Sequence, residues 1–150
     1  MVHFEDVGRQ VLGFLRDDLR MNAITVETDF RAGVPPVHAD PTQVQQVILN
    51  LVKNAVEAMI ARPGMRRLRL ATSVSGEFAL FSVQDSGSGI SEEDRDRIFD
   101  AFFTKKPAGT GMGLGLAISR TLVENHQGLL RLAKTGADGS LFEVAIPAAS

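Results

Sequence analysis

The sequence predicts an α+β fold: a two-layer α/β sandwich in which three helices cover one face of a mixed sheet. Two observations predict it. Helical periodicity occurs early, in the middle and late in the chain, and strand-like segments come in adjacent pairs joined by short turns. Such links are too short for a crossover, which argues against a doubly wound parallel sheet. Because 150 residues is the length of one domain, we expect residues 1–150 to form a single domain.

The first half of the chain alternates helix and strand signals. The expected elements are a helix over residues 3–21, a strand over residues 24–30 and a helix from Asp40-Pro41-Thr42 to about Ala61. The first helix follows from apolar residues at every third or fourth position, and the strand from alternation. Asp40 can accept hydrogen bonds from the first-turn amides, and Pro41 stands where a missing N–H has no cost. Pro63-Gly64 ends the second helix.

The second half adds two predicted hairpins around two helices. The expected elements are strands over 68–74 and 78–83, a short helix from Ser91 to about Ile98, a long helix from Leu114 to about Asn125, and strands over 129–134 and 141–146. Ser75-Gly76-Glu77 and residues 135–140 carry turn residues between the paired strands. Ser91-Glu92-Glu93-Asp94 resembles a capping box.

Composition excludes several classes of protein. There is no cysteine, so disulfides, thiolate metal sites and cysteine nucleophiles are excluded. With 16 Lys+Arg against 18 Asp+Glu the formal charge is −2, which argues against nucleic acid as the main partner. The apolar runs are far shorter than the roughly 20 residues that span a bilayer. We therefore expect a soluble cytoplasmic module with no direct membrane contact.

Two polar clusters follow apolar segments. Asn50, Asn54 and Glu57 stand at i, i+4 and i+7 of the second predicted helix, so they line one stripe, and short amide side chains in an apolar helix need buried partners. A merely polar helix face is the alternative.

The second cluster is Asp85-Ser86-Gly87-Ser88-Gly89-Ile90. It ends a strand with two alternate glycines, which permit close approach of a ligand to the backbone. An ordinary turn is the alternative there.

Two further clusters lie between residues 98 and 116. Phe99, Phe102 and Phe103 precede the pair Lys105-Lys106, which is either a solvated pair or a phosphate contact. Glycine then occupies every second position from Gly109 to Gly115, leading into a helix. Free amides and a helix N-terminus favour an anion, so this loop predicts a phosphate site; a hinge that closes over another ligand is the alternative.

Together these motifs resemble the catalytic and ATP-binding domain of sensor histidine kinases. The order Asn-x-x-x-Asn, Asp-x-Gly-x-Gly, Phe-x-x-Phe-Phe, Gly-x-Gly-x-Gly-Leu-Gly is similar to that family's N, G1, F and G2 boxes, most of all in its nitrogen- and oxygen-sensing branch. The similarity runs from about Asp40 to Pro147. It implies the Bergerat ATP-binding sandwich, which agrees with the layout expected from the strand pairs and helices.

The resemblance implies a role for each matched residue. It gives Asp85 the adenine amino group, Gly87 and Gly89 the turn around the base, and Asn54 the Mg²⁺ ion, with Asn50 and Lys106 completing the catalytic group. Residues 104–113 would form a flexible lid over ATP. The further ATP contacts it implies are Glu57, Ile90, Phe103, Thr104, Lys105, Gly109, Thr110, Gly111, Met112, Gly113, Leu114 and Gly115. The phosphate contact stays open between Lys105 and Lys106.

The resemblance also implies the reaction. Gyrase-like relatives place a water-activating Glu four residues before the metal-binding Asn; here that residue is Asn50, and an amide is no general base near neutral pH. Hydrolysis should be poor and phosphoryl transfer to a supplied acceptor favoured.

The acceptor itself is expected outside this chain. None of His3, His38 and His126 stands in a phosphoacceptor setting. We expect a histidine on a separate dimerisation domain of the same kinase, a response regulator as an indirect partner, and a monomeric isolated domain that can belong to a membrane-anchored protein. An anti-sigma-factor serine kinase and a non-catalytic nucleotide-binding module are the alternatives.

Overall fold

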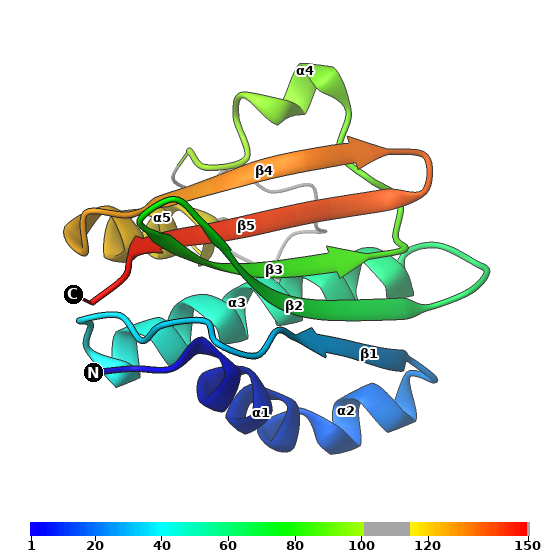
Figure 1. Cartoon of the computed structure of the whole chain (residues 1–150). Coiled ribbons are helices and arrows are strands. Elements are labelled where there is room, and N and C mark those ends of the chain that lie inside the picture. Colours follow the sequence, from blue (N-terminus) through cyan, green and yellow to red (C-terminus); the bar gives the residue numbers. More distant parts are fainter. Residues whose placement is uncertain (101–114, 150) are drawn as a thin grey trace.

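The computed structural model describes residues 1–100 and 115–149 and contains a five-stranded sheet (Figure 1). The strands are β1 (Thr25–Phe30), β2 (Arg67–Ser75), β3 (Phe78–Asp85), β4 (Leu129–Gly136) and β5 (Gly139–Pro147), in the spatial order β1-β2-β3-β5-β4. β1 pairs with β2 in parallel, and the other neighbours are antiparallel. The predicted mixed sheet is confirmed.

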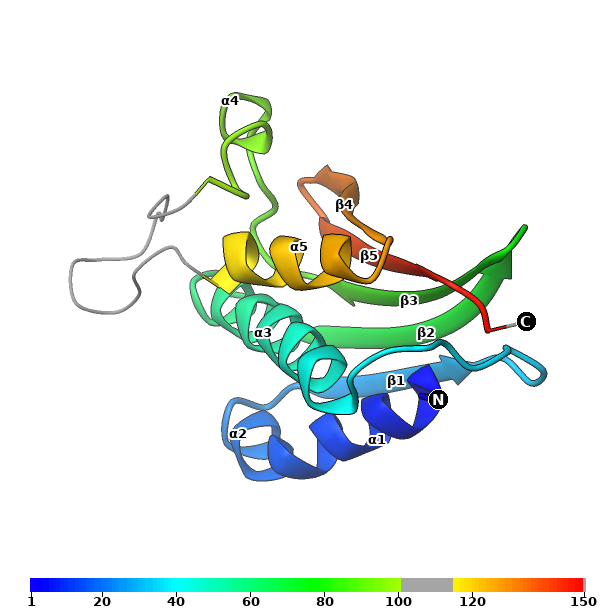
Figure 2. The same cartoon turned by 90° about the vertical axis from the view of Figure 1, so that its left-hand side faces the viewer.

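Three helices lie on one face of the sheet and make the second layer (Figure 2). They are α1 (Phe4–Phe14), α3 (Pro41–Ile60) and α5 (Gly115–Asn125), with α3 in the middle, in contact with both others. The short helices are α2 (Arg16–Met21) and α4 (Glu92–Arg95). The predicted α+β sandwich is therefore confirmed. No helix among the described residues has both the length and the apolar character needed to cross a membrane.

The central helix α3 begins where the sequence predicts. The side chain of Asp40 accepts hydrogen bonds from the backbone N–H groups of Thr42 and Gln43, at 2.9 and 3.4 Å. Its core face carries seven buried residues: Val44, Val47, Ile48, Leu51, Val52, Ala55 and Met59. Their three- and four-residue spacing forms a stripe that packs against the sheet.

Strand β3 carries the apolar alternation up to its last residue. Ala79, Phe81 and Val83 are buried on the helix side, and the Phe81 ring lies 6.0 Å from that of Phe4. Because side chains of a strand alternate between faces, Asp85 points to the same side. The periodicity thus places a carboxylate at the end of the apolar core.

Several predicted boundaries are wrong. The helix expected over residues 3–21 is two helices, with a break at Leu15, two residues after Gly13, a poor helix former. The helix expected from Ser91 to Ile98 ends at Arg95, although Ser91 does cap it. Strands β4 and β5 extend to Gly136 and from Gly139, so their turn holds two residues rather than six.

Candidate functional site

Asp85 is the buried acidic end of β3. Asp85 is 5% exposed, and its Oδ1 accepts a hydrogen bond of 2.8 Å from the backbone N–H of Gly87. Burial raises the pKa of Asp85, while hydrogen bonds from the backbone of Gly87 and Ser140 oppose that rise. A carboxylate held in this way is poised to accept a hydrogen bond from a ligand.

The turn after Asp85 packs so closely that its glycines are required. A Cβ on Gly87 would lie 2.7 Å from the backbone carbon of Ala58 in the last turns of α3. Gly89 has φ +75°, and a Cβ there would lie 2.1 Å from the carbonyl oxygen of Gly136. The sequence predicted that these glycines let a ligand approach the backbone; in this structure the segments that approach it are α3 and β4.

The β4–β5 hairpin holds the other side of this turn. Thr135 Oγ1 accepts a 2.8 Å hydrogen bond from the N–H of Ile90 and lies 3.0 Å from Ser140 Oγ. A Cβ on Gly139, at φ +122°, would collide with the carbonyl oxygen of Asp85. Sequence reasoning missed Thr135 and Ser140 as supports of the site, because it gave residues 135–140 only as a turn.

The asparagines of α3 lie between this turn and α5. Asn50 Nδ2 donates a 3.2 Å hydrogen bond to Ser119 Oγ on α5, and Ser119 is completely buried. Asn54 is half-buried one helical turn later, and Ala58, which touches Gly87, comes one turn after that. Residues four apart share a helix face, so Asn54 stands between the α5 contact and the Asp85 turn.

The three predicted positions share one helix face. The structure brings Asn50, Asn54 and the turn of Asp85 to one face of α3, and Glu57, seven residues after Asn50, lies exposed on the same face. Asn50 has the buried partner that its burial required. Among the described residues, no three His, Cys, Asp or Glu side chains gather as a metal site.

Most of the predicted phosphate site lies outside the described residues. This applies to Phe102 and to Phe103, Thr104, Lys105, Lys106, Gly109, Thr110, Gly111, Met112, Gly113 and Leu114, and so to the lid expected over 104–113. Gly115 is described: it is exposed and is the first residue of α5. Phe99 packs edge-to-face against Phe142 of β5, with ring centroids 6.3 Å apart, so it acts as a core anchor.

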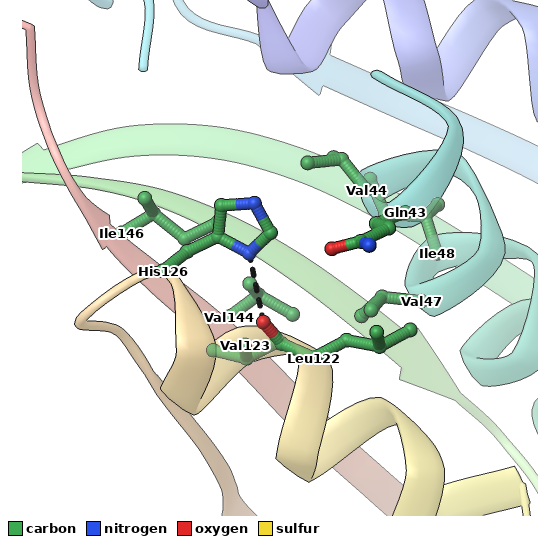
Figure 3. A pocket seen from close by; sticks show the side chains of 9 residues that line it. All are labelled: Gln43, Val44, Val47, Ile48, Leu122, Val123, His126, Val144 and Ile146. Atoms are coloured by element: carbon green, nitrogen blue, oxygen red, sulfur yellow. Dashed lines mark hydrogen bonds between the residues drawn. The ribbon is translucent and has the colours of Figure 1, made fainter. Parts of the chain in front are cut away.

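A small apolar hollow lies between the start of α3 and the end of α5, away from Asp85 (Figure 3). His126 borders it: Nδ1 lies 2.8 Å from the carbonyl oxygen of Leu122, and Nε2 accepts a 3.2 Å hydrogen bond from the N–H of Asp40. The sequence showed only that this histidine does not stand in a phosphoacceptor setting. Its half-buried ring joins α5 to the N-cap of α3.

Comparisons with known proteins identify the arrangement. Residues 39–150 match the family described as histidine kinase-, DNA gyrase B-, and HSP90-like ATPase. The sensor protein TdiS of Thauera aromatica is 36% identical over 97% of this chain. The chain spans only 27% of the length of TdiS.

Solved structures share the fold over nearly the whole chain. The nucleotide-free catalytic domain of the histidine kinase ThkA has a TM-score of 0.84 at 31% identity, covering 97% of this chain and 92% of that one. ThkA in complex with the response regulator TrrA gives 0.81 at 28% identity, covering 98% and 41%. Full-length ShkA in complex with AMPPNP gives 0.86 at 29% identity, covering 99% and 31%. This chain therefore belongs to the family of histidine kinase-, DNA gyrase B- and HSP90-like ATPases, with the fold of a histidine kinase catalytic domain.

Proposed function

We propose that this chain binds ATP with Mg²⁺ and transfers the γ-phosphoryl group to a histidine on a separate phosphoacceptor domain. The observation that carries the proposal is the convergence on one face of α3 of a buried carboxylate, Asp85, and two amide side chains, Asn50 and Asn54. ThkA and ShkA, the kinases with this fold, support the same reading.

Asp85 would recognise the base. The exocyclic amine of adenine is a donor, and a carboxylate that accepts from the backbone of Gly87 and Ser140 still has acceptor lone pairs for that donor. Gly89 and Ile90, fixed by the β4–β5 hairpin, would form the wall of the base site. Guanine presents an acceptor in place of the amine, so this arrangement favours adenine.

Asn54 would hold the metal and Asn50 would support it. Amide oxygens are hard ligands suited to Mg²⁺, which needs few protein ligands when phosphate oxygens and water complete its octahedron. The Ser119 contact engages Asn50 through Nδ2, which leaves its Oδ1 to face the ion. Bound Mg·ATP would supply the phosphoryl group, and catalysis would rest on positioning and charge neutralisation.

The phosphate contacts are proposed from the sequence alone. Lys105 or Lys106 would neutralise phosphate charge, and the glycines from Gly109 to Gly115 would offer backbone amides. Residues 104–113 would serve as the lid. Because Asn50 is no general base, the proposal includes slow hydrolysis and transfer to a supplied acceptor.

The acceptor and downstream partner are proposed as separate domains in the cytoplasm. Both ring nitrogens of His126 take part in hydrogen bonds. His3 and His38 are exposed and precede α3, the helix that carries the asparagines. A response regulator would take the phosphoryl group from the phosphohistidine, as the ThkA–TrrA complex suggests for that kinase.

Phosphotransfer with radiolabelled ATP tests the proposal. The chain is incubated with Mg²⁺ and either a histidine-bearing helical dimerisation domain of a related sensor kinase or a serine-bearing anti-sigma antagonist. Acid-labile label on the first acceptor is expected. Acid-stable label on serine would replace the histidine assignment by the serine kinase, and ATP binding without transfer to either would leave a nucleotide-binding module.

A further inference from the structure

We propose that Arg62 is a positioning residue that holds the adenine-binding turn, residues 85–90, in its binding conformation. The inference deepens the proposed function and rests on it. Arg62 follows the C-cap of α3 and is half-buried. Both of the segments that its side chain contacts are distant from it in sequence.

One guanidinium nitrogen joins three parts of the fold. Arg62 Nη1 donates a 2.8 Å hydrogen bond to the carbonyl oxygen of Gly87, and the same nitrogen donates to the carbonyl oxygen of Ala137 in the β4–β5 turn. These acceptors are 25 and 75 positions away along the chain. Arg62 therefore links the end of α3, the adenine-binding turn and the hairpin that supports it.

The contact acts on the peptide that sets the Asp85 geometry. Gly87 donates its N–H to Asp85 Oδ1, and its carbonyl accepts from Arg62. Gly87 is thus held at both its N–H and its carbonyl, and its close packing against Ala58 of α3 limits its movement. Without Arg62 the carbonyl of Gly87 loses its charged donor, and the turn gains freedom that ATP binding must then remove.

Arg62 has a rival role, since its positive charge could attract the phosphates directly. The two roles make different predictions. A charge effect survives replacement by lysine and grows with the number of phosphates. A positioning effect needs the reach of the arginine side chain, because lysine ends one bond short of the position of Nη1, and it weakens ATP and ADP by the same factor, because both carry adenine.

The chain contains a matched control in Arg66. Arg66 lies in the same α3–β2 connection, is half-buried, and donates through Nη1 to a backbone carbonyl, that of Asn22, at 2.7 Å. Asn22 is the C-cap residue of α2, so this contact supports another part of the fold. Arg66→Met removes the same charge and the same kind of hydrogen bond, and it leaves in place the backbone groups of Met65 and Arg67 that bond Ser86 of the adenine-binding turn.

The experiment measures ATP and ADP affinity by calorimetry, and melting temperature, for the wild type, Arg62→Met, Arg62→Lys, Arg66→Met and Asp85→Asn. We expect Arg62→Met to raise the Kd of both nucleotides about tenfold, the size of one lost charge-assisted hydrogen bond. Arg62→Lys should also bind more weakly than the wild type by more than twofold. Arg66→Met should bind within twofold of the wild type.

Each result has one meaning for the inference. A wild-type Kd in Arg62→Lys, an equal loss in Arg66→Met, or a loss confined to ATP would overturn it. If Arg62→Met does not melt cooperatively, the Kd of Arg62→Lys decides the inference: a Kd more than twofold above that of the wild type supports it, and a smaller change overturns it. Failure of the proposed function looks different: the wild type then does not bind ATP, or Asp85→Asn binds it unchanged.

Discussion

The amide of Asn50 on α3 is tied to the hydroxyl of Ser119 on α5 by a hydrogen bond of 3.2 Å. Ser119 is 0% exposed and lies one turn into the helix that begins at Gly115. The bond therefore connects the helix that carries both asparagines to the helix that follows the glycine-rich segment. It also fixes which end of the Asn50 amide points toward α5.

Ser119→Ala should weaken Mg·ATP binding by roughly twofold to tenfold, because Asn50 loses its orienting partner at a cost of about 0.5–1.5 kcal/mol. Thr121→Ala is the matched control: it removes a hydroxyl from an exposed position of α5 that donates to the carbonyl of Ala117. Calorimetric titration with Mg·ATP measures both. Equal affinities of the two variants would contradict a role for the Asn50–Ser119 bond.

Asp85→Asn should lower ATP affinity at least tenfold without lowering the melting temperature at neutral pH. The asparagine keeps an oxygen for the Gly87 N–H but turns its amide NH2, a donor, toward the adenine amine, which is also a donor. Stability is kept because the variant buries no charge and so has no cost of desolvating one. Asp29→Asn, at an exposed carboxylate of β1 paired with Arg69, is the control. Unchanged ATP affinity in Asp85→Asn would refute the assignment of the base site.

The pH dependence of stability should report the same carboxyl. Burial raises the pKa of folded Asp85 above its ordinary value of 3.8. Between these two values the folded state binds more protons than the unfolded state, so the free energy of unfolding falls as pH rises. The contribution of Asp85 to the free energy of unfolding is fully present below pH 3.8 and is lost as the pH rises through the raised pKa.

Urea unfolding of the wild type and Asp85→Asn over this range isolates the effect, since other groups cancel in the difference. We expect the wild type to lose stability relative to the variant as pH rises. ATP affinity of the wild type should increase across the same window, because the ionised carboxylate is the better acceptor. A difference in unfolding free energy that is independent of pH would argue against a raised pKa.

Local sequence signals predicted the elements that depend on periodicity and capping. The Asp40 cap, the core stripe of α3 and the β2–β3 hairpin around Gly76 are local properties, and the structure confirms them. Asp85 was predicted as a site residue from its place after a strand, and the strand period explains its burial.

Contacts between distant segments could not be predicted. Arg62, Thr135 and Ser119 join parts of the chain separated by 25 to 75 positions, and nothing in their neighbouring residues shows the partner. The break at Leu15 was missed for a related reason: apolar spacing continues through it, so the pattern has no signal for a change of helix. His126 likewise shows its partner Asp40 only in the folded chain.

Gly87→Ala should destabilise the fold by about 1–3 kcal/mol and weaken ATP binding, because the new Cβ would lie 2.7 Å from backbone atoms of α3 that cannot move aside. Gly13→Ala is the opposite case. Its Cβ would meet nothing within 4 Å on α1, so it should stabilise the chain by roughly 0.5–1 kcal/mol. Chemical denaturation measures both, and a Gly87→Ala variant as stable as the wild type would show that the turn is not packed against Ala58.

Asn54→Ala should remove most of the Mg²⁺ dependence of ATP binding while leaving the fold intact. Asn54 lies on α3 between Asn50, held by Ser119, and Ala58, packed on Gly87, so it stands on the helix face of the proposed triphosphate site. Loss of a hard oxygen ligand should weaken Mg·ATP binding at least tenfold but change metal-free ATP binding little, since base recognition by Asp85 remains. Lys53→Ala, at the exposed neighbouring position, controls for a change in helix charge. Titrations with and without Mg²⁺ give the ratio of the two affinities, and a wild-type ratio in Asn54→Ala would place the metal on other residues.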